Sequence, residues 1–134
     1  MHSPHNPDFE ARVRSSFARQ AAMSLIGARL TTVEPGRCVI ELPARDDLTQ
    51  QHGFVHGGVV GMIADSAGGY AGFTLMPADA SVLTVEYKIN MLAPAAGDLL
   101  IAIGEVLKPG RTLSIVRAEV FGVQGDRRTR VAAM

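Results

Sequence analysis

The feature that most restricts the fold of this chain is an apolar, glycine-rich helix predicted from Gly57 to about Leu75. The stretch HGFVHGGVVGMIADSAGG, residues 52–69, leads into this helix and contains Asp65 as its one carboxylate. Pro77 cannot continue a helix and is expected to end it. A carboxylate among small and apolar residues is either a structural acid with a hidden partner or a chemical reagent.

The predicted helix has two unlike faces when its residues are placed at 100° intervals. One face is bulky and is expected to pack on the concave side of a sheet: Val59, Met62, Ile63, Ser66, Tyr70 and Phe73. The opposite face carries Asp65 among four glycines: Gly61, Gly68, Gly69 and Gly72. Because each interior glycine costs a helix about 1 kcal/mol, this face indicates that another backbone, a second subunit or a ligand comes very close. Solvent does not require glycine, so the pattern argues against a simply exposed acid.

The remaining elements are mostly strands. A helical segment is predicted over Asp8–Met23, because Phe9, Val13, Phe17 and Ala21 recur four residues apart. Strands are predicted on both sides of Pro35-Gly36 within 28–43, over 81–93, over 99–108 and 111–122 around Pro109-Gly110, and after the turn at 125–128. A central helix against an antiparallel sheet of five or six strands defines an α+β class. Residues 1–134 are expected to form one domain, with 1–23 as an N-terminal helical segment and 57–75 as the central helix.

Composition excludes several classes of function. Lysine plus arginine equal aspartate plus glutamate at 13 each, so no overall field draws the chain to nucleic acid. No apolar run approaches the ~20 residues that a membrane span needs, and a cytoplasmic location is expected. The single cysteine, Cys38, cannot form an internal disulfide and is predicted to be a packed core thiol. No metal site is expected, since His52 and His56 have no cysteine or further histidine nearby in the sequence, and no GxSxG motif indicates a serine nucleophile.

The start of the central helix is a candidate oxyanion site. His56-Gly57-Gly58 offers unpaired backbone N–H groups at the positive end of the helix dipole, although an ordinary entry turn explains two glycines equally well. Gly57 and Asp65 are eight residues apart, or about 12 Å along a helix, so one carbonyl cannot contact both within a chain. If both act on one substrate, two copies of the helix must lie antiparallel, and the chain is a homodimer.

Several motifs together resemble the hotdog-fold thioesterases of the PaaI type. They are Gln50, His56-Gly57-Gly58, Ala64-Asp65, the stretch SVLTVEYKINMLAPA, Gly97-Asp98 and LKPGRTLS at 107–114, and they cover roughly residues 20–133. The resemblance implies a central helix wrapped by an antiparallel sheet, a dimer that often pairs into a homotetramer, and hydrolysis of acyl-CoA thioesters without metal or cofactor.

The resemblance also assigns roles to five residues. Asp65 matches the catalytic carboxylate, which acts as general base or nucleophile, and Gly57 matches the residue whose N–H polarises the thioester carbonyl. Gln50 corresponds to a side chain that helps to hold that carbonyl. His56 corresponds to a histidine that orients the loop or the leaving sulfur. Thr84 corresponds to a hydroxyl that orients the attacking water.

Simpler interpretations stay open for three of these residues and for the function. Gln50 can be a surface loop residue, Thr84 a strand residue chosen for its β propensity, and His56 a structural histidine at the helix entry. A non-hydrolytic acyl-CoA binding or regulatory module, and less favourably a hydratase or dehydratase, are the competing functions on this fold. The acyl group is open between aryl and medium-chain types. A predicted apolar pocket consists of Met62, Tyr70, Phe73, Met76 and Met91.

Overall fold

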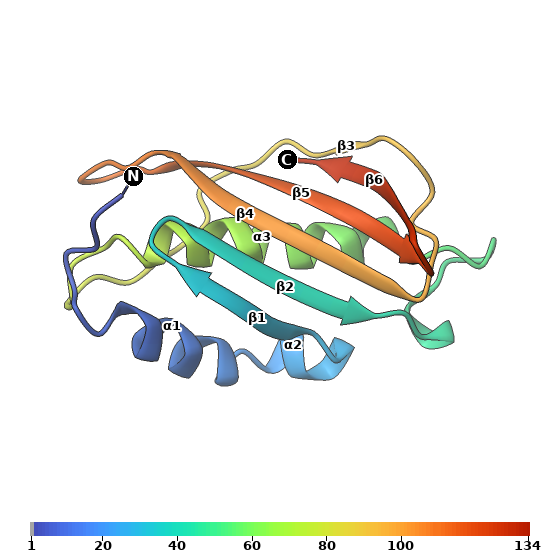
Figure 1. The fold of residues 1–134 in the computed structure, drawn as a ribbon, viewed down its shortest axis with the longest axis horizontal. Helices are drawn as coiled ribbons and strands as arrows, with labels where there is room; N and C mark the ends of the chain where they lie inside the picture. The colour runs from blue at the N-terminus through green and yellow to red at the C-terminus, as the bar shows by residue number, and fades with distance from the viewer. Residues whose placement is uncertain (1) are drawn as a thin grey trace.

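A computed structural model describes residues 2–134 and shows one long helix lying against one face of an antiparallel sheet (Figure 1). The helix, α3, spans Gly57–Phe73 and is followed by a turn before Pro77, as predicted. The sheet has six strands in the order β1-β2-β4-β5-β6-β3. Their bounds are β1 Arg29–Glu34, β2 Arg37–Pro43, β3 Asn90–Met91, β4 Leu99–Lys108, β5 Ile115–Gln124 and β6 Arg127–Ala133. The α+β class and the strand number are confirmed.

Alternation along β2 and β4 creates the buried face of the sheet. Cys38, Ile40 and Leu42 point inward and are fully buried, and each pairs with a small or apolar residue of β4. Burial raises the pKa of the Cys38 thiol to about 12, which agrees with the predicted inert core cysteine. The β4–β5 hairpin is also confirmed, but β5 begins only at Ile115, so its loop is longer than a Pro-Gly turn.

Helix and sheet approach each other closely at Gly104 of β4. A Cβ at this position would overlap the carbonyl of Ala67 and the backbone nitrogen of Gly68. The side chain of Val116 on β5 covers Gly68 and Gly72, at 3.0 and 3.7 Å from where their Cβ atoms would be. Side chains of the same chain therefore cover Gly68 and Gly72, whereas Gly69 has no such neighbour within 4 Å.

The predicted assignment of the bulky face to the sheet is wrong in part. Tyr70 bonds to side chains of the N-terminal helical segment, and Arg12 of that segment stacks on the Phe73 ring at 4.1 Å. The larger residues of α3 pack against both layers: Tyr70 and Phe73 cluster with Val13 of α1 and with Cys38 of the sheet. Asp65 and Gly69 are partly open.

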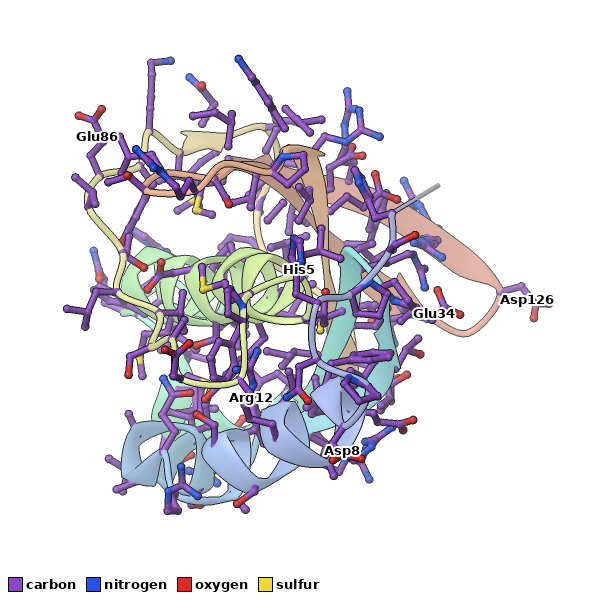
Figure 2. The ribbon with its side chains drawn as sticks, turned by 90° about the vertical axis from the view of Figure 1, so that its left-hand side faces the viewer. His5, Asp8, Arg12, Glu34, Glu86 and Asp126 are labelled. Carbon is purple, nitrogen blue, oxygen red and sulfur yellow. The ribbon has the colours of Figure 1, made fainter. Side chains whose placement is uncertain are left out.

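The N-terminal segment forms two helices instead of the predicted one. Helix α1 spans Phe9–Ala18 and helix α2 spans Ala21–Ile26, separated where Gln20 adopts an extended conformation. Ala21 is consequently exposed, and the apolar cover continues through Met23 and Ile26 instead. Figure 1 shows both helices alongside β1, and Figure 2 shows Arg12 between α1 and the end of α3.

The predicted strand over 81–93 is wrong for most of its length. Only Asn90 and Met91 pair, with Ala133 and Ala132 of β6, and no backbone hydrogen bond joins residues 81–89 to the rest of the described chain. The physical reason is that none of the strands within residues 2–134 lies beside 81–89. Leu83 and Val85 are 89% and 74% exposed, and Glu86 projects outward at this edge (Figure 2).

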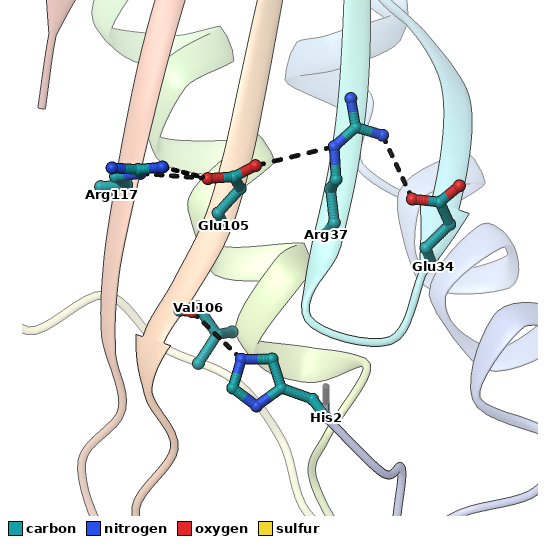
Figure 3. A network of polar contacts seen from close by, with 6 residues as sticks. All are labelled: His2, Glu34, Arg37, Glu105, Val106 and Arg117. Carbon is teal, nitrogen blue, oxygen red and sulfur yellow. Dashed lines mark hydrogen bonds and ion pairs between the residues drawn. The ribbon is translucent and has the colours of Figure 1, made fainter.

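The outer face of the sheet is charged. Arg117 of β5 pairs with Glu105 of β4 at 2.7 Å, Arg37 of β2 lies 3.8 Å from the same carboxylate, and Arg37 also pairs with Glu34 at 3.2 Å (Figure 3). Exposed pairs of this kind contribute about 0–1 kcal/mol each. The face is solvated, and the candidate site lies on the helix side of the sheet.

Candidate active site

Asp65 and Thr84 form the centre of the candidate site. The Thr84 hydroxyl donates to Asp65 Oδ1 at 2.6 Å. Asp65 is half-buried in the third turn of α3, and its Oδ2 accepts no hydrogen bond from the described residues. The carboxylate therefore has one oxygen held by the protein and one oxygen free for a ligand.

Thr84 reaches Asp65 because segment 81–91 lies across α3 in the opposite direction. Beyond Thr84, the Tyr87 hydroxyl lies 3.6 Å from where a Cβ on Gly61 would be, and Met91 Cε lies 3.2 Å from the corresponding position on Gly57. The segment thus follows the helix back toward its N-terminus. This path joins the two ends of the candidate site on one surface.

A pocket of about 360 Å³ opens beside Asp65. Its lining combines α1, the loop to α2, α3 and the extended segment: Ser16, Gln20, Asp65, Ser66, Gly69, Tyr70, Val82, Leu83 and Thr84. Of the five residues predicted to line an apolar pocket, only Tyr70 does so. The prediction was wrong because the N-terminal helices approach this part of α3 with polar side chains.

The N-terminus of α3 leaves one donor free. His56 Nδ1 accepts from Gly58 N–H at 2.8 Å, and the His56 carbonyl accepts from Val59 and Val60 N–H at 2.9 and 3.1 Å. The Gly57 N–H has no acceptor within residues 2–134. His56 is the N-cap of the helix, and Gly57 offers an unpaired N–H at the positive end of the dipole.

Gln50 closes the loop that precedes the helix. Its Oε1 accepts from the backbone N–H of His52 at 2.7 Å and of Phe54 at 3.2 Å. The side-chain amide nitrogen donates to no group in the described part of the chain. This contact gives Gln50 a structural role that the sequence left open, with two hydrogens still available.

The predicted site residues fall into two groups within one chain. Asp65 and Thr84 lie together at the middle of α3, whereas Gln50, His56 and Gly57 lie at its N-terminus, about 12 Å away along the helix. Among residues 2–134, no group of three histidine, cysteine or acidic side chains has the proximity that a metal ion needs, and no helix has the length and apolarity to cross a membrane.

The sequence alone does not indicate that Ser16 and Gln20 line the pocket. Ser16 and Gln20 reach the pocket only because α1 docks on α3 and the chain bends at Gln20. Their sequence neighbourhood is an ordinary amphipathic helix, which carries no sign of a pocket. Ser66 was predicted to pack on the sheet. Only its position next to Asp65 in the sequence could have indicated that it lines the pocket.

Thioesterases are among the known proteins that this chain resembles. The thioesterase superfamily model matches residues 52–128. A thioesterase family protein of Silicibacter pomeroyi has a similar structure, with TM-score 0.92, 46% identity and coverage of 93% of this chain and 92% of that one. The PaaI protein of E. coli shares the fold, with TM-score 0.81, 21% identity and coverage of 94% and 88%. A 1,4-dihydroxy-2-naphthoyl-CoA hydrolase of Listeria monocytogenes is 28% identical over 67% of this chain and 73% of its own length.

The chain belongs to the thioesterase superfamily and has the hotdog fold of PaaI-like proteins. It is a thioester hydrolase of that family, which confirms the enzyme class inferred from the sequence.

Proposed function

We propose that the protein hydrolyses acyl-CoA thioesters in sites shared between two copies of the chain, with Asp65 as the catalytic carboxylate. The observation that carries the proposal is the Asp65 carboxylate at the mouth of a pocket, with Oδ1 held by Thr84 and Oδ2 free. The CoA hydrolase among the relatives supports a coenzyme A ester as the substrate. The acyl group enters the pocket, and the coenzyme A part stays outside.

The chemistry requires few groups because a thioester is already activated. In the base route, Asp65 Oδ2 takes a proton from water as the water oxygen attacks the carbonyl carbon. The resulting oxyanion needs a preorganised donor, and the C–S bond then breaks to release the thiolate, which regains a proton as free coenzyme A. In the nucleophile route, Oδ2 attacks the carbonyl carbon and the C–S bond breaks to release the coenzyme A thiolate, which takes up a proton. Water then cleaves the acyl-aspartate anhydride to give the free acid and restore Asp65.

In this proposal the oxyanion donor comes from the second copy. Gly57 N–H is unpaired but about 12 Å from Asp65 along the same helix, so it serves the site of the partner chain. Gln50 Nε2, also free, is a further candidate donor to that carbonyl, and His56 fixes the helix start that presents Gly57.

The unpaired segment 81–89 supports an antiparallel dimer. Its backbone groups and exposed Leu83 and Val85 form an open strand edge, which favours antiparallel pairing with its own copy. A two-fold axis between Tyr87 and Lys88 would bring Thr84 opposite the partner's Met91. Since Met91 lies over Gly57 and Thr84 binds Asp65, this register brings Asp65 toward the partner's Gly57.

The test is thiol release from a panel of aryl and medium-chain acyl-CoAs, with Asp65→Asn beside wild type. Asn keeps the size of the side chain and the bond from Thr84 but cannot take a proton, so we expect kcat to fall about 10²- to 10⁴-fold. Asp126→Asn, at the exposed tip of the β5–β6 hairpin (Figure 2), is the matched control and keeps its activity. Unchanged turnover in Asp65→Asn would remove the proposed carboxylate, and tight binding of acyl-CoA without release by wild type would favour a binding module.

A further inference from the structure

The pocket beside Asp65 ends in a polar chain of side chains that the proposed hydrolysis does not use. The Ser16 and Tyr70 hydroxyls lie 3.2 Å apart, the Tyr70 hydroxyl donates to Gln20 Oε1 at 3.4 Å, and Gln20 Nε2 donates to Ser66 Oγ at 3.2 Å. Ser66 and Tyr70 are each only 7% exposed. Polar groups so deep in a pocket need hydrogen-bond partners, and they penalise a ligand that offers none.

The direction of these bonds shows which hydrogens are left over. The Tyr70 hydroxyl donates its one hydrogen to Gln20 Oε1, so Ser16 is the donor in its bond with the Tyr70 oxygen. Gln20 has a second amide hydrogen, and Ser66 has a hydroxyl hydrogen, and neither meets an acceptor within residues 2–134. Both residues line the pocket, so the groups available to a ligand there are donors.

The position of these donors is fixed by the docking of α1. The Arg12 guanidinium bonds to the carbonyls of Phe73 at 2.9 Å and Met76 at 2.8 Å and also to that of Pro77, at the end of α3. The Phe17 ring packs edge-on against Tyr70, with centroids 5.9 Å apart. Contacts on both sides of Ser16 therefore hold the first helix against the pocket, while the bonds within the polar chain are long enough to yield to a ligand.

We propose that the pocket selects acyl groups that carry an acceptor oxygen, such as a ketone or hydroxyl oxygen, positioned to meet Gln20 Nε2 and Ser66 Oγ. This inference rests on the proposed function only in that the same pocket holds the acyl group of the thioester. A plain alkyl chain leaves two donors without partners after water is displaced, and an acceptor oxygen satisfies them. Gln20 and Ser66 are the specificity-determining residues, and Ser16 and Tyr70 position Gln20.

The experiment compares hexanoyl-CoA with its 3-oxo, 4-oxo and 5-oxo derivatives, because a ketone accepts hydrogen bonds and donates none. We expect at least one oxo derivative to exceed hexanoyl-CoA about tenfold in kcat/KM. Gln20→Glu replaces the donor with an acceptor of the same shape, and Ser66→Ala removes the hydroxyl. Each variant should therefore lower the ratio of kcat/KM for the oxo derivative to kcat/KM for hexanoyl-CoA toward one. Ser15→Ala, the neighbouring exposed serine of α1, is the matched control and keeps the ratio.

The outcomes separate this inference from the hydrolysis itself. Cleavage of all four esters with ratios near one, or ratios that Gln20→Glu and Ser66→Ala leave unchanged, would overturn the selectivity while the thioesterase activity stands. If no ester is cleaved, the dissociation constants of the same four ligands for wild-type protein decide the question. About tenfold tighter binding of an oxo derivative supports the inference, and equal or absent binding overturns it.

Discussion

At the scale of single residues, His56 shows how one side chain carries two separable roles. Its Nδ1 caps the first turn of α3 by accepting from Gly58 N–H, and the imidazole is exposed. His56→Ala removes the cap and is expected to lower the free energy of unfolding by about 1 kcal/mol. His56→Asn replaces one capping acceptor with another, so its free energy of unfolding should stay within about 0.5 kcal/mol of the wild-type value. Urea unfolding of the three proteins measures the difference.

Turnover of the same variants tests the chemical role of His56. If the histidine only presents the helix start, the asparagine variant hydrolyses thioesters as wild type does. A stable asparagine variant with a large loss in kcat would instead assign the imidazole to the leaving sulfur. Equal stability of the alanine and wild-type proteins would contradict the capping role.

At the scale of elements, the contact between α3 and β4 depends on one missing methyl group. A Cβ on Gly104 would overlap the Ala67 carbonyl, and backbone cannot move aside as a flexible side chain can. Gly104→Ala is therefore expected to lower the free energy of unfolding by about 3 kcal/mol. Gly69→Ala, in the helix itself, meets no atom within 4 Å and should raise it by up to about 1 kcal/mol.

Both variants replace glycine with alanine, so the difference between their free energies of unfolding reports the packing and not the residue type. Thermal or urea unfolding of each variant shows whether it is more or less stable than wild type. A tolerated Gly104→Ala would show that helix and sheet separate easily. A destabilising Gly69→Ala would indicate that a second copy packs closely on that side of α3.

The elements also show what the sequence could predict. The helix from Gly57, the two strands on either side of Pro35-Gly36 and the strand at 99–108 are local patterns, and each was predicted correctly. The face of α3 that meets the sheet was predicted only in part, because the contact at Ala67 depends on Gly104, a lone glycine in a strand whose sequence gives no sign of it. Residues 81–89 alternate as a strand does, but pairing needs a neighbour, which a local pattern does not report.

Some residues of the candidate site could be predicted from the sequence, and others could not. Asp65, Gly57 and Thr84 were predicted from the motifs, and the bond between Thr84 and Asp65 is consistent with their proposed cooperation. Ser16 and Gln20 could not be predicted, because they reach the pocket through the docking of α1, which depends on Arg12 and the distant end of α3.

At the scale of the whole molecule, the proposed dimer predicts that two inactive variants restore each other. Asp65→Asn removes the carboxylate, and Gly57→Pro removes the N–H at the first helical position, where proline fits the backbone. The extended ψ of His56, 136°, also suits a residue before proline. Each variant alone should lose at least about 10²-fold in kcat, and Gly57→Ala, which keeps the N–H, should lose far less.

A mixed dimer of the two variants has one site with both defects and one site with neither, because each site takes Asp65 from one chain and Gly57 from the other. Co-expression in equal amounts with different tags should therefore recover about a quarter of the wild-type thioesterase activity, and the isolated mixed dimer about half. Sites formed within one chain would give no recovery, since every chain would carry a defect. Recovery that appears on mixing and disappears when the dimer is dissociated by dilution would show that Asp65 and Gly57 act across the interface between two copies.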